Sequence, residues 1–275
     1  MLYPIAARIV TDSNAMLPAE LIERFGILAV PLTIVIDGDP HREDEIDLVT
    51  FYEQLRCGTV ISTSAPSPGE ILATYERAVS AGAGAILSVH VGSNRSATVA
   101  SARLAAEQLG VPVTIVDTGT ASFIEGCCVW RAAEQLAAGA SIDAAASAAR
   151  ALAAEAASVF TIGEIARAAR SGRLALGADD GLPVFASSGA DMHELRRVES
   201  TDAAIEVMVE LVAGHGGPLR VGVGNADADP SSAACSLEDA LLALPNVAET
   251  IRYTVGPSVA AHTGAGTFGA VFHQI

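Results

Sequence analysis

The chain has 275 residues, of which 51% are hydrophobic and only 4% aromatic, and its formal net charge at pH 7 is −16. This length allows one large α/β unit or two packed lobes, with a core built from Ala, Val, Leu and Ile. The negative charge repels nucleic-acid phosphates, so we do not expect nucleic acid among the partners.

Strands and helices alternate along the first half of the chain. We expect strands over residues 7–10, 27–36, 85–90 and 111–116, and helices over residues 18–24, 47–55, 70–81 and 97–109. Turn chemistry at residues 37–40 and a Ser/Pro/Gly loop at residues 62–69 interrupt this pattern. Alternating strands and helices favour a parallel sheet covered by helices on both faces, as in Rossmann-like α/β/α folds.

Ala-rich helices are expected over residues 123–138 and 142–156, followed by a β-type segment at residues 159–162. We place the domain boundary here, giving an N-terminal α/β domain of residues 1–158 and a smaller C-terminal α/β domain of residues 159–275. Periodicity is weaker beyond this point. The segments it marks are 182–185, 201–213, 220–223 and 249–254, with a helix over 236–244 and a strand-like end at 270–272 after the glycine-rich residues 256–269.

Several classes of protein are disfavoured by the sequence. The longest apolar run, residues 27–36, is too short to span a bilayer and contains Pro31, and residues 1–13 lack the pattern of a signal peptide. The four cysteines form no C-x-x-C pair, which argues against a disulfide framework or a zinc site. All 16 basic residues are arginine, which excludes a Schiff-base or P-loop lysine. We therefore expect a cytoplasmic protein without a membrane span, metal or cofactor.

Four polar loops follow the expected strands and helices, and three of them come directly after apolar strands. They are Thr11-Asp12-Ser13-Asn14, Ser62-Thr63-Ser64, Gly92-Ser93-Asn94-Arg95-Ser96 and Asp117-Thr118-Gly119-Thr120. In open α/β sheets, ligands bind at the carboxyl ends of the strands, so these loops are the candidate site.

Small hydroxyl groups in such loops have two interpretations. They can cap the first free N–H groups of a helix, and Ser67 with Glu70 three residues later fits a capping box. They can also donate to an anion beside a helix N-terminus, for which Thr63, Ser93 and Ser96 are the candidates. The pattern alone leaves both interpretations open for these three residues.

Enzymatic alternatives need further groups. A serine hydrolase or acyltransferase would use Ser93 with His90 or His262 as its base, although no G-x-S-x-G elbow is present. A histidine at a strand end is more typical of a satisfied core residue. The acidic run at residues 42–47 lacks the spacing of a calcium loop, and no glycine fingerprint for a nucleotide precedes a helix.

Taken in order, these loops resemble the DegV family, whose motifs read T-D-S, V-P-L, F-Y, T-S-Q-P-S-P-G-E, S-S-x-L-S-G-T, G-G-R and H-x-G-P-G. The matching segments are Thr11-Asp12-Ser13, Val30-Pro31-Leu32, Phe51-Tyr52, residues 63–70 and 93–98, Val116-Asp117-Thr118, Ser171-Gly172-Arg173 and residues 262–267. The resemblance covers nearly the whole chain.

The resemblance implies a two-lobed α/β protein that binds a long-chain fatty acid in a tunnel closed by the second lobe, without catalysing a reaction itself. It implies that Thr63 and Ser93, with Ser64, Ser96 and His262, hold the carboxylate. It also implies that some members present the acid to a separate fatty-acid kinase, for which Arg170 and Arg173 are the expected partner-binding residues.

This sequence departs from the family pattern at the head-group loop. Gly92 replaces a serine, Arg95 a leucine and Ala97 a glycine, while Ala65 replaces a glutamine. Arg95 adds a positive charge to the loop. The usually basic region after Arg173 is acidic here, so the resemblance supports lipid binding more strongly than kinase binding.

Overall fold

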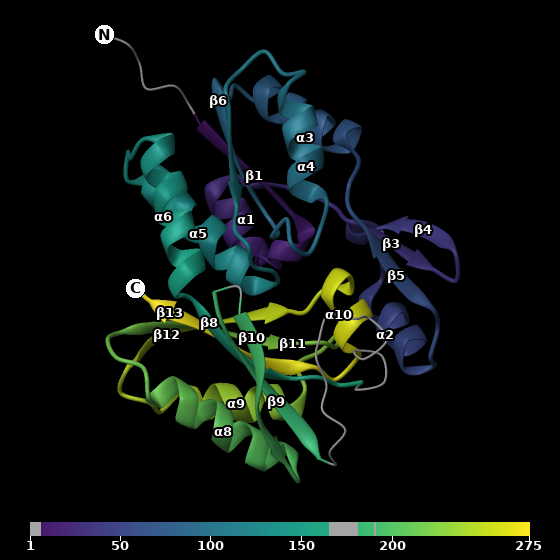
Figure 1. The fold of residues 1–275 in the computed structure, drawn as a ribbon, viewed down its shortest axis with the longest axis vertical. Coiled ribbons are helices and arrows are strands. Elements are labelled where there is room, and N and C mark those ends of the chain that lie inside the picture. The colour runs from purple at the N-terminus through teal and green to yellow at the C-terminus, as the bar shows by residue number, and fades with distance from the viewer. Residues whose placement is uncertain (1–6, 165–180, 190) are drawn as a thin grey trace. The chain divides into compact units, whose positions relative to one another are not determined.

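The computed structural model describes residues 7–164, 181–189 and 191–275 (Figure 1). Its elements in chain order are β1 (Ala7–Asp12), η1 (Ser13–Ala15), α1 (Ala19–Phe25), β2 (Leu28–Val30), β3 (Thr33–Ile36), β4 (Asp39–Arg42), η2 (Glu43–Glu45), α2 (Leu48–Arg56), β5 (Ile61–Ser64), α3 (Pro68–Ser80), β6 (Ala85–His90), α4 (Thr98–Ala106), β7 (Val113–Asp117), α5 (Phe123–Ala137), α6 (Ile142–Glu155), β8 (Ala157–Thr161), β9 (Leu182–Ser188), β10 (Asp191–Val198), α8 (Thr201–Ala213), β11 (Leu219–Asn225), α9 (Ser232–Leu242), β12 (Val247–Thr254), α10 (Pro257–Thr263) and β13 (Phe268–Gln274).

The elements form two compact units. The first contains Met1–Thr33, Arg42–Asp44 and Thr63–Ala154, and the second contains Ile34–His41, Glu45–Ser62 and Glu155–Ile275. Each unit combines helices with a sheet, which confirms the expected two-lobe α/β class. None of the helices described is long and apolar enough to cross a membrane.

The first unit is built on a four-stranded parallel sheet with the order β2-β1-β6-β7. Every residue of β6 is buried, as expected for a central strand covered on both faces. Because the strands are parallel, β1, β6 and β7 end at the same edge, with His90 directly opposite Asp117 in the register. This edge gathers three of the four polar loops that the sequence singles out, those of residues 11–14, 92–96 and 117–120, whereas residues 62–64 belong to β5 in a separate three-stranded sheet.

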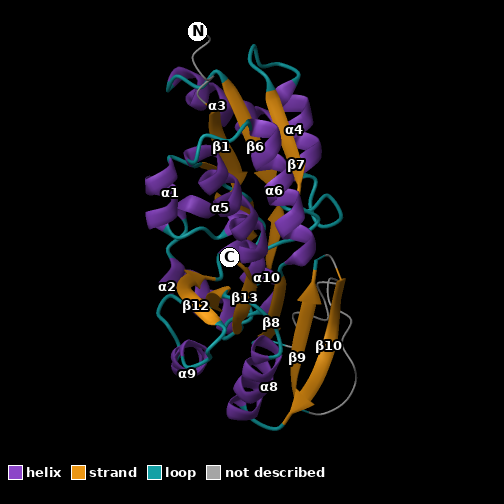
Figure 2. Cartoon of the chain, turned by 90° about the vertical axis from the view of Figure 1, so that its left-hand side faces the viewer, coloured by secondary structure: helices purple, strands orange, loops and turns teal. Residues whose placement is uncertain are grey.

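Helices cover both faces of this sheet (Figures 1 and 2). Helices α3 and α4 pack on one face, where Ile71, Tyr75 and Ile86 belong to the buried cluster. Helix α5 packs on the other face against β1 and β6 and carries Trp130, the only tryptophan of the chain. The α/β/α layering that alternation predicts is therefore present.

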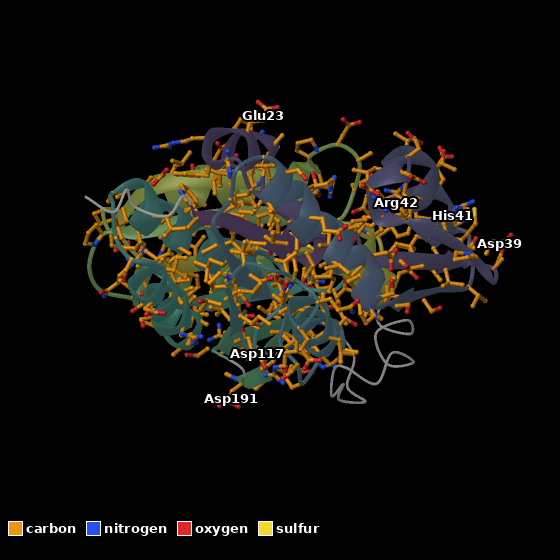
Figure 3. All side chains as sticks on the ribbon, turned by 90° about the horizontal axis from the view of Figure 1, so that it is seen from above. Glu23, Asp39, His41, Arg42, Asp117 and Asp191 are labelled. Carbon is orange, nitrogen blue, oxygen red and sulfur yellow. The ribbon has the colours of Figure 1, made fainter. Side chains whose placement is uncertain are left out.

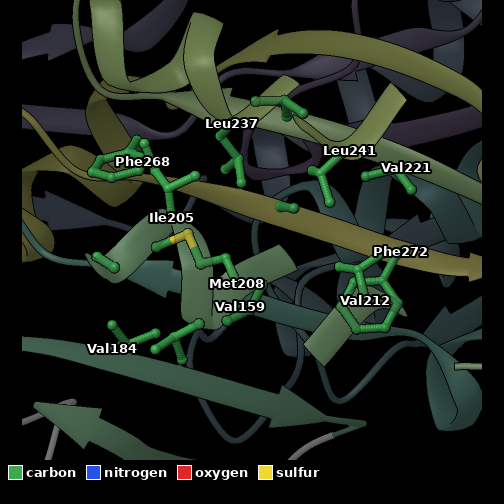
Figure 4. Packing of buried hydrophobic residues seen from close by; sticks show 14 of the residues in the cluster. Val159, Val184, Ile205, Met208, Val212, Val221, Leu237, Leu241, Phe268 and Phe272 are labelled. Atoms are coloured by element: carbon green, nitrogen blue, oxygen red, sulfur yellow. The ribbon is translucent and has the colours of Figure 1, made fainter. Parts of the chain in front are cut away.

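The second unit contains a six-stranded mixed sheet with the order β10-β9-β8-β13-β11-β12. Only the β11–β12 pair is parallel among the pairings of this sheet. Helices α8 and α9 pack against it, and their apolar side chains interlock with those of the strands (Figure 4). The residues labelled there are Val159, Val184, Ile205, Met208, Val212, Val221, Leu237, Leu241, Phe268 and Phe272.

Three local expectations differ from the structure. The run at residues 27–36 is two strands, because Pro31 lacks an N–H and the Leu32 N–H donates to the Ser13 hydroxyl instead of continuing the ladder. Residues 62–64, expected as the start of a loop, lie in β5, which joins β3 and β4 in a small sheet. The turn at residues 37–40 is tighter than expected, since Asp37 and Gly38 have positive φ and β4 begins at once.

Candidate functional site

The loop of residues 92–96 leaves the carboxyl end of β6 and is held by the neighbouring loop after β7. The Gly92 N–H donates to the Thr120 carbonyl at 2.7 Å, and the Ser96 N–H turns back to the Gly92 carbonyl at 3.1 Å. A Cβ at Gly92 would lie 2.6 Å from the Gly119 carbonyl carbon. Glycine at this position therefore lets the two loops pack backbone against backbone.

Ser93 is exposed on this loop and is oriented by Asp117. Its N–H donates to Asp117 Oδ1 at 3.0 Å, and the Gly119 N–H donates to the same oxygen at 3.1 Å. Burial raises the pKa of Asp117, but hydrogen bonds from the Ser93 side chain and backbone and from Gly119, with the charge of Arg103, lower that pKa overall. Asp117 is thus an ionised acceptor that anchors Ser93 (Figure 3 labels its position).

Ser96 lies at the start of α4. Its hydroxyl is 2.8 Å from the Thr98 hydroxyl and accepts from the Thr98 N–H at 3.3 Å. The N-cap of α4 is Ala97, which makes no side-chain cap bond, so the Ser96 hydroxyl is engaged just before the helix. Ser93 is the more exposed of the two serines.

Thr63 and Ser64 end strand β5. Thr63 is half-buried, whereas Ser64 is exposed and donates to the Ala65 carbonyl at 3.4 Å. Ser67, which follows, caps α3: its hydroxyl accepts from the Glu70 N–H and the Glu70 carboxylate accepts from the Ser67 N–H. The predicted capping box is confirmed.

His262 is half-buried on α10 in the second unit. The turn that follows it is tied together by Thr267, whose hydroxyl donates to the Thr263 and Gly264 carbonyls and accepts from the Gly163 N–H at 3.0 Å. The expected partner-binding residues Arg170 and Arg173 lie outside the described residues.

His90 is engaged in a buried network and not with Ser93. Its Nε2 lies 2.6 Å from the Ser88 hydroxyl and its Nδ1 lies 3.0 Å from Asp12 Oδ2. The imidazole is 0% exposed, as is Ser88, whose hydroxyl also contacts the Tyr75 hydroxyl at 2.7 Å. Both ring nitrogens are occupied, so the geometry does not support a Ser93–His90 hydrolase. His90 is the satisfied core histidine that its strand-end position favours.

A second carboxyl group lies beside this network. Glu125 is fully buried on α5, and its Oε1 accepts from the Thr11 hydroxyl at 3.2 Å. Burial first, and then the charge of Asp12, raise the pKa of Glu125 well above its ordinary value. The buried site therefore favours the protonated form of Glu125. The sequence places Asp12 in a polar loop but does not single out Glu125, because nothing local indicates that α5 covers the end of β1.

Metal ligands do not cluster in the part of the chain that is described. No group of three His, Cys, Asp or Glu side chains there is arranged to hold an ion. The site instead offers hydroxyl and backbone donors at the edge of a parallel sheet, which is an arrangement suited to a small anionic group.

The fold and these loops define a two-unit α/β protein with a hydroxyl-lined edge on its parallel sheet. A family model described as "Uncharacterised protein, DegV family" matches residues 6–274. A DegV domain-containing protein of Streptomyces coelicolor is 34% identical over 274 residues, covering 96% of each chain. The chain belongs to the DegV family, which confirms the resemblance.

Solved structures of the family share the whole fold. A DegV family protein of Thermus thermophilus, described by its fatty-acid binding, superposes with a TM-score of 0.89 at 30% identity and covers 98% of this chain and 100% of its own. DegV of Bacillus subtilis, described as a fatty acid binding protein, gives a TM-score of 0.85 at 25% identity over 98% of this chain and 99% of its own.

Proposed function

We propose that this protein binds a long-chain fatty acid in a buried tunnel, with the carboxylate held by Thr63 and Ser93. The main support is the exposed Ser93 hydroxyl on a loop that Asp117 and Thr120 hold in place. The relatives described as fatty-acid-binding proteins share this fold along the full chain. Ser64, Ser96 and His262 complete the proposed head-group set.

The proposal is tested by identifying what the purified protein holds. Native mass spectrometry should find a saturated or mono-unsaturated acid, and delipidated protein should bind hexadecanoate. Protein that copurifies with no lipid and does not bind hexadecanoate would refute the proposal. Hexadecanol serves as the matched control ligand, because it has the same tail without the carboxylate. We call the ratio of the hexadecanol Kd to the hexadecanoate Kd the carboxylate selectivity.

Arg95 is a proposed addition to this head-group set. It lies two residues after Ser93, and its Nε is enclosed without a hydrogen-bond acceptor among the described residues. Buried donors are normally paired, and a ligand carboxylate would supply the missing acceptor. Arg95→Leu, which restores the usual family residue, should lower the carboxylate selectivity and leave the hexadecanol Kd unchanged. Equal weakening of both ligands would exclude the contact.

The protein is proposed to act as a carrier, not as a catalyst. The bound acid would be presented to a separate ATP-dependent fatty-acid kinase, with Arg170 and Arg173 at the docking face. A serine-reactive phosphonate tests the enzymatic alternative, since labelling of Ser93 that disappears in Ser93→Ala would contradict the carrier role. For the kinase step, Arg170→Ala and Arg173→Ala should reduce acyl-phosphate formation at unchanged hexadecanoate affinity.

A further inference from the structure

A continuous chain of buried side chains connects helix α3 to the end of strand β1. It runs from the Tyr75 hydroxyl to Ser88 at 2.7 Å, from Ser88 to His90 Nε2 at 2.6 Å, and from His90 Nδ1 to Asp12 Oδ2 at 3.0 Å. All four residues are 0% exposed. Buried polar groups are costly unless paired, so a fully paired chain of this length holds its members in one arrangement.

The direction of each hydrogen bond follows from Asp12. The N–H groups of Asn14 and Val91 donate to its two oxygens at 3.1 Å and 3.2 Å, so its carboxylate acts as an acceptor. His90 Nδ1 then carries the proton and donates to Asp12, and Nε2 accepts from the Ser88 hydroxyl. Burial raises the pKa of Tyr75 to about 12, which keeps its phenol protonated as the donor to Ser88.

Asp12 holds the end of β6 at the residue that precedes the candidate loop. The Val91 N–H donates a hydrogen bond to Asp12, and Gly92 is the next residue in the chain. The opposite side of the same strand end is held by Thr118, whose N–H and hydroxyl both donate to the His90 carbonyl, at 3.2 Å and 2.9 Å. The starting point and direction of the Ser93 loop are therefore set by Asp12 on the β1 side and by Thr118 on the β7 side.

We propose that Asp12 is a positioning residue of the head-group site: through Val91 and the His90 ring, its buried carboxylate holds the loop of residues 92–96 so that Ser93 meets the ligand carboxylate. This inference rests on the proposed fatty-acid binding. Asp12 itself is 0% exposed, so we expect its effect to reach the ligand only through the loop.

Asp12→Asn provides the direct test. An amide presents one oxygen and one NH₂ group, so it cannot accept together from the Asn14 N–H, the Val91 N–H and His90 Nδ1. Misplacement of Ser93 amounts to losing one charge-assisted hydrogen bond, so the carboxylate selectivity should fall by about tenfold or more while the hexadecanol Kd stays within about twofold. Equal weakening of both ligands would show that Asp12 is merely structural and would overturn the proposal.

Thr74→Val is the matched control for stability. Thr74 is buried on α3 and its hydroxyl donates to the Glu70 carbonyl at 3.2 Å, outside the Tyr75–Asp12 chain. This variant should lower the melting temperature without changing the carboxylate selectivity. If it changes the selectivity as much as Asp12→Asn does, general destabilisation explains both results and the proposal fails.

Two further variants keep the proposal falsifiable. Ser88→Ala removes the hydroxyl that holds His90 Nε2, so the imidazole can rotate away from Asp12 without any added volume. This variant should lower the carboxylate selectivity by about threefold. It tests the proposal even if Asp12→Asn does not fold. In a Ser93→Ala background, Asp12→Asn should have little additional effect, since both act through the same hydroxyl. Full additivity would contradict the proposal, whereas wild-type protein that does not bind hexadecanoate would instead refute the proposed function.

Discussion

Asp117 makes the Ser93 loop sensitive to acid. Its lowered pKa means that the folded protein holds a carboxylate at pH values where the unfolded chain binds a proton. The stability from Asp117 is therefore fully present above its ordinary pKa of about 3.9 and is lost as pH falls through the lowered folded pKa. Asp117→Asn should unfold at lower urea than wild type near pH 7, and this difference should vanish near pH 2.

Asp191→Asn is a suitable control for this experiment, because Asp191 is exposed at the start of the edge strand β10 (Figure 3). It should leave the urea midpoint unchanged at both pH values. A constant difference between wild type and Asp117→Asn at all pH values would show that ionisation of Asp117 is not involved.

Glu125 has the opposite pH dependence. Because its pKa is raised, the folded protein keeps a proton that the unfolded chain releases above about pH 4.3. Stability from this group is present below the ordinary pKa and is lost as pH rises through the folded pKa. Glu125→Gln keeps the shape without the titration, so it should flatten the decline in the free energy of unfolding as pH rises above about 4.3.

The groups around Glu125 define what this pH profile reports. Asp12 faces Glu125 from β1 and is hydrogen-bonded to His90. Cys128 lies one turn further along α5, and burial together with the neighbouring Cys127 raises the pKa of its thiol. Glu134→Gln on the half-buried face of the same helix is the control, and it should retain the wild-type slope. An unchanged slope in Glu125→Gln would assign the titration to another group.

The contact between the loops after β6 and β7 depends on Gly92. The nearest atoms to a Cβ there are Asn94 Oδ1 at 2.5 Å and the Gly119 carbonyl carbon at 2.6 Å, and the latter is backbone that cannot rotate away. Gly92→Ala should therefore destabilise the protein by roughly 1–3 kcal/mol, as overpacking does. It should also weaken the binding of hexadecanoate more than the binding of hexadecanol. Chemical unfolding and the two Kd values measure this.

Gly110→Ala is the matched control, because a Cβ at Gly110 meets no atom within 4 Å. It should leave both stability and selectivity close to wild type. A Gly92→Ala protein of wild-type stability would mean that the two loops can separate without cost.

Helices and central strands of the first unit follow from the sequence, because their periodicity and caps are local. Apolar runs predict β6 and β7, and the Ser67–Glu70 pair predicts the start of α3. The short strands do not follow in the same way. Residues 61–64 carry turn-forming serines and form β5 only because β3 is beside them, which is a tertiary effect.

The glycine-rich end shows the same limit. Helix α10 (Pro257–Thr263) begins at a proline in its first turn, a signal for helix starts that the surrounding glycines obscured. The sequence predicts only residues 182–185 of the β9–β10 pair, because half of the residues of β10 are exposed and carry no apolar pattern.

For the candidate site, sequence order predicts which loops meet, because parallel strands end at one edge. It does not predict the partners of buried polar residues. Asp12 caps η1 by accepting from the Asn14 N–H, which is a local contact, but its hydrogen bonds with Val91 and His90 come from residues about 80 positions away. Such contacts depend on strand order, which a single sequence does not specify.

Over the whole molecule, the tail and the head group are expected to contribute differently to affinity. Each buried CH₂ contributes about 0.8 kcal/mol, whereas a charge-assisted hydrogen bond contributes about 1.5–3 kcal/mol. Tetradecanoate, two CH₂ groups shorter than hexadecanoate, should bind about 15-fold more weakly. Thr63→Ala should weaken every acid by a similar factor and leave the dependence on chain length unchanged. A series of Kd values for both proteins would decide this, and equal affinity for all lengths would argue against a closed tunnel.

Trp130 gives the molecule an optical property of its own. The single indole of the chain is 3% exposed on α5, the helix that also carries Glu125. Its fluorescence therefore reports a single buried site, and no other tryptophan contributes to the signal. Any event that admits water under α5, whether ionisation of Glu125 or loosening at Asp12, should shift this emission to the red, so the covered face of the parallel sheet can be followed in real time without a label.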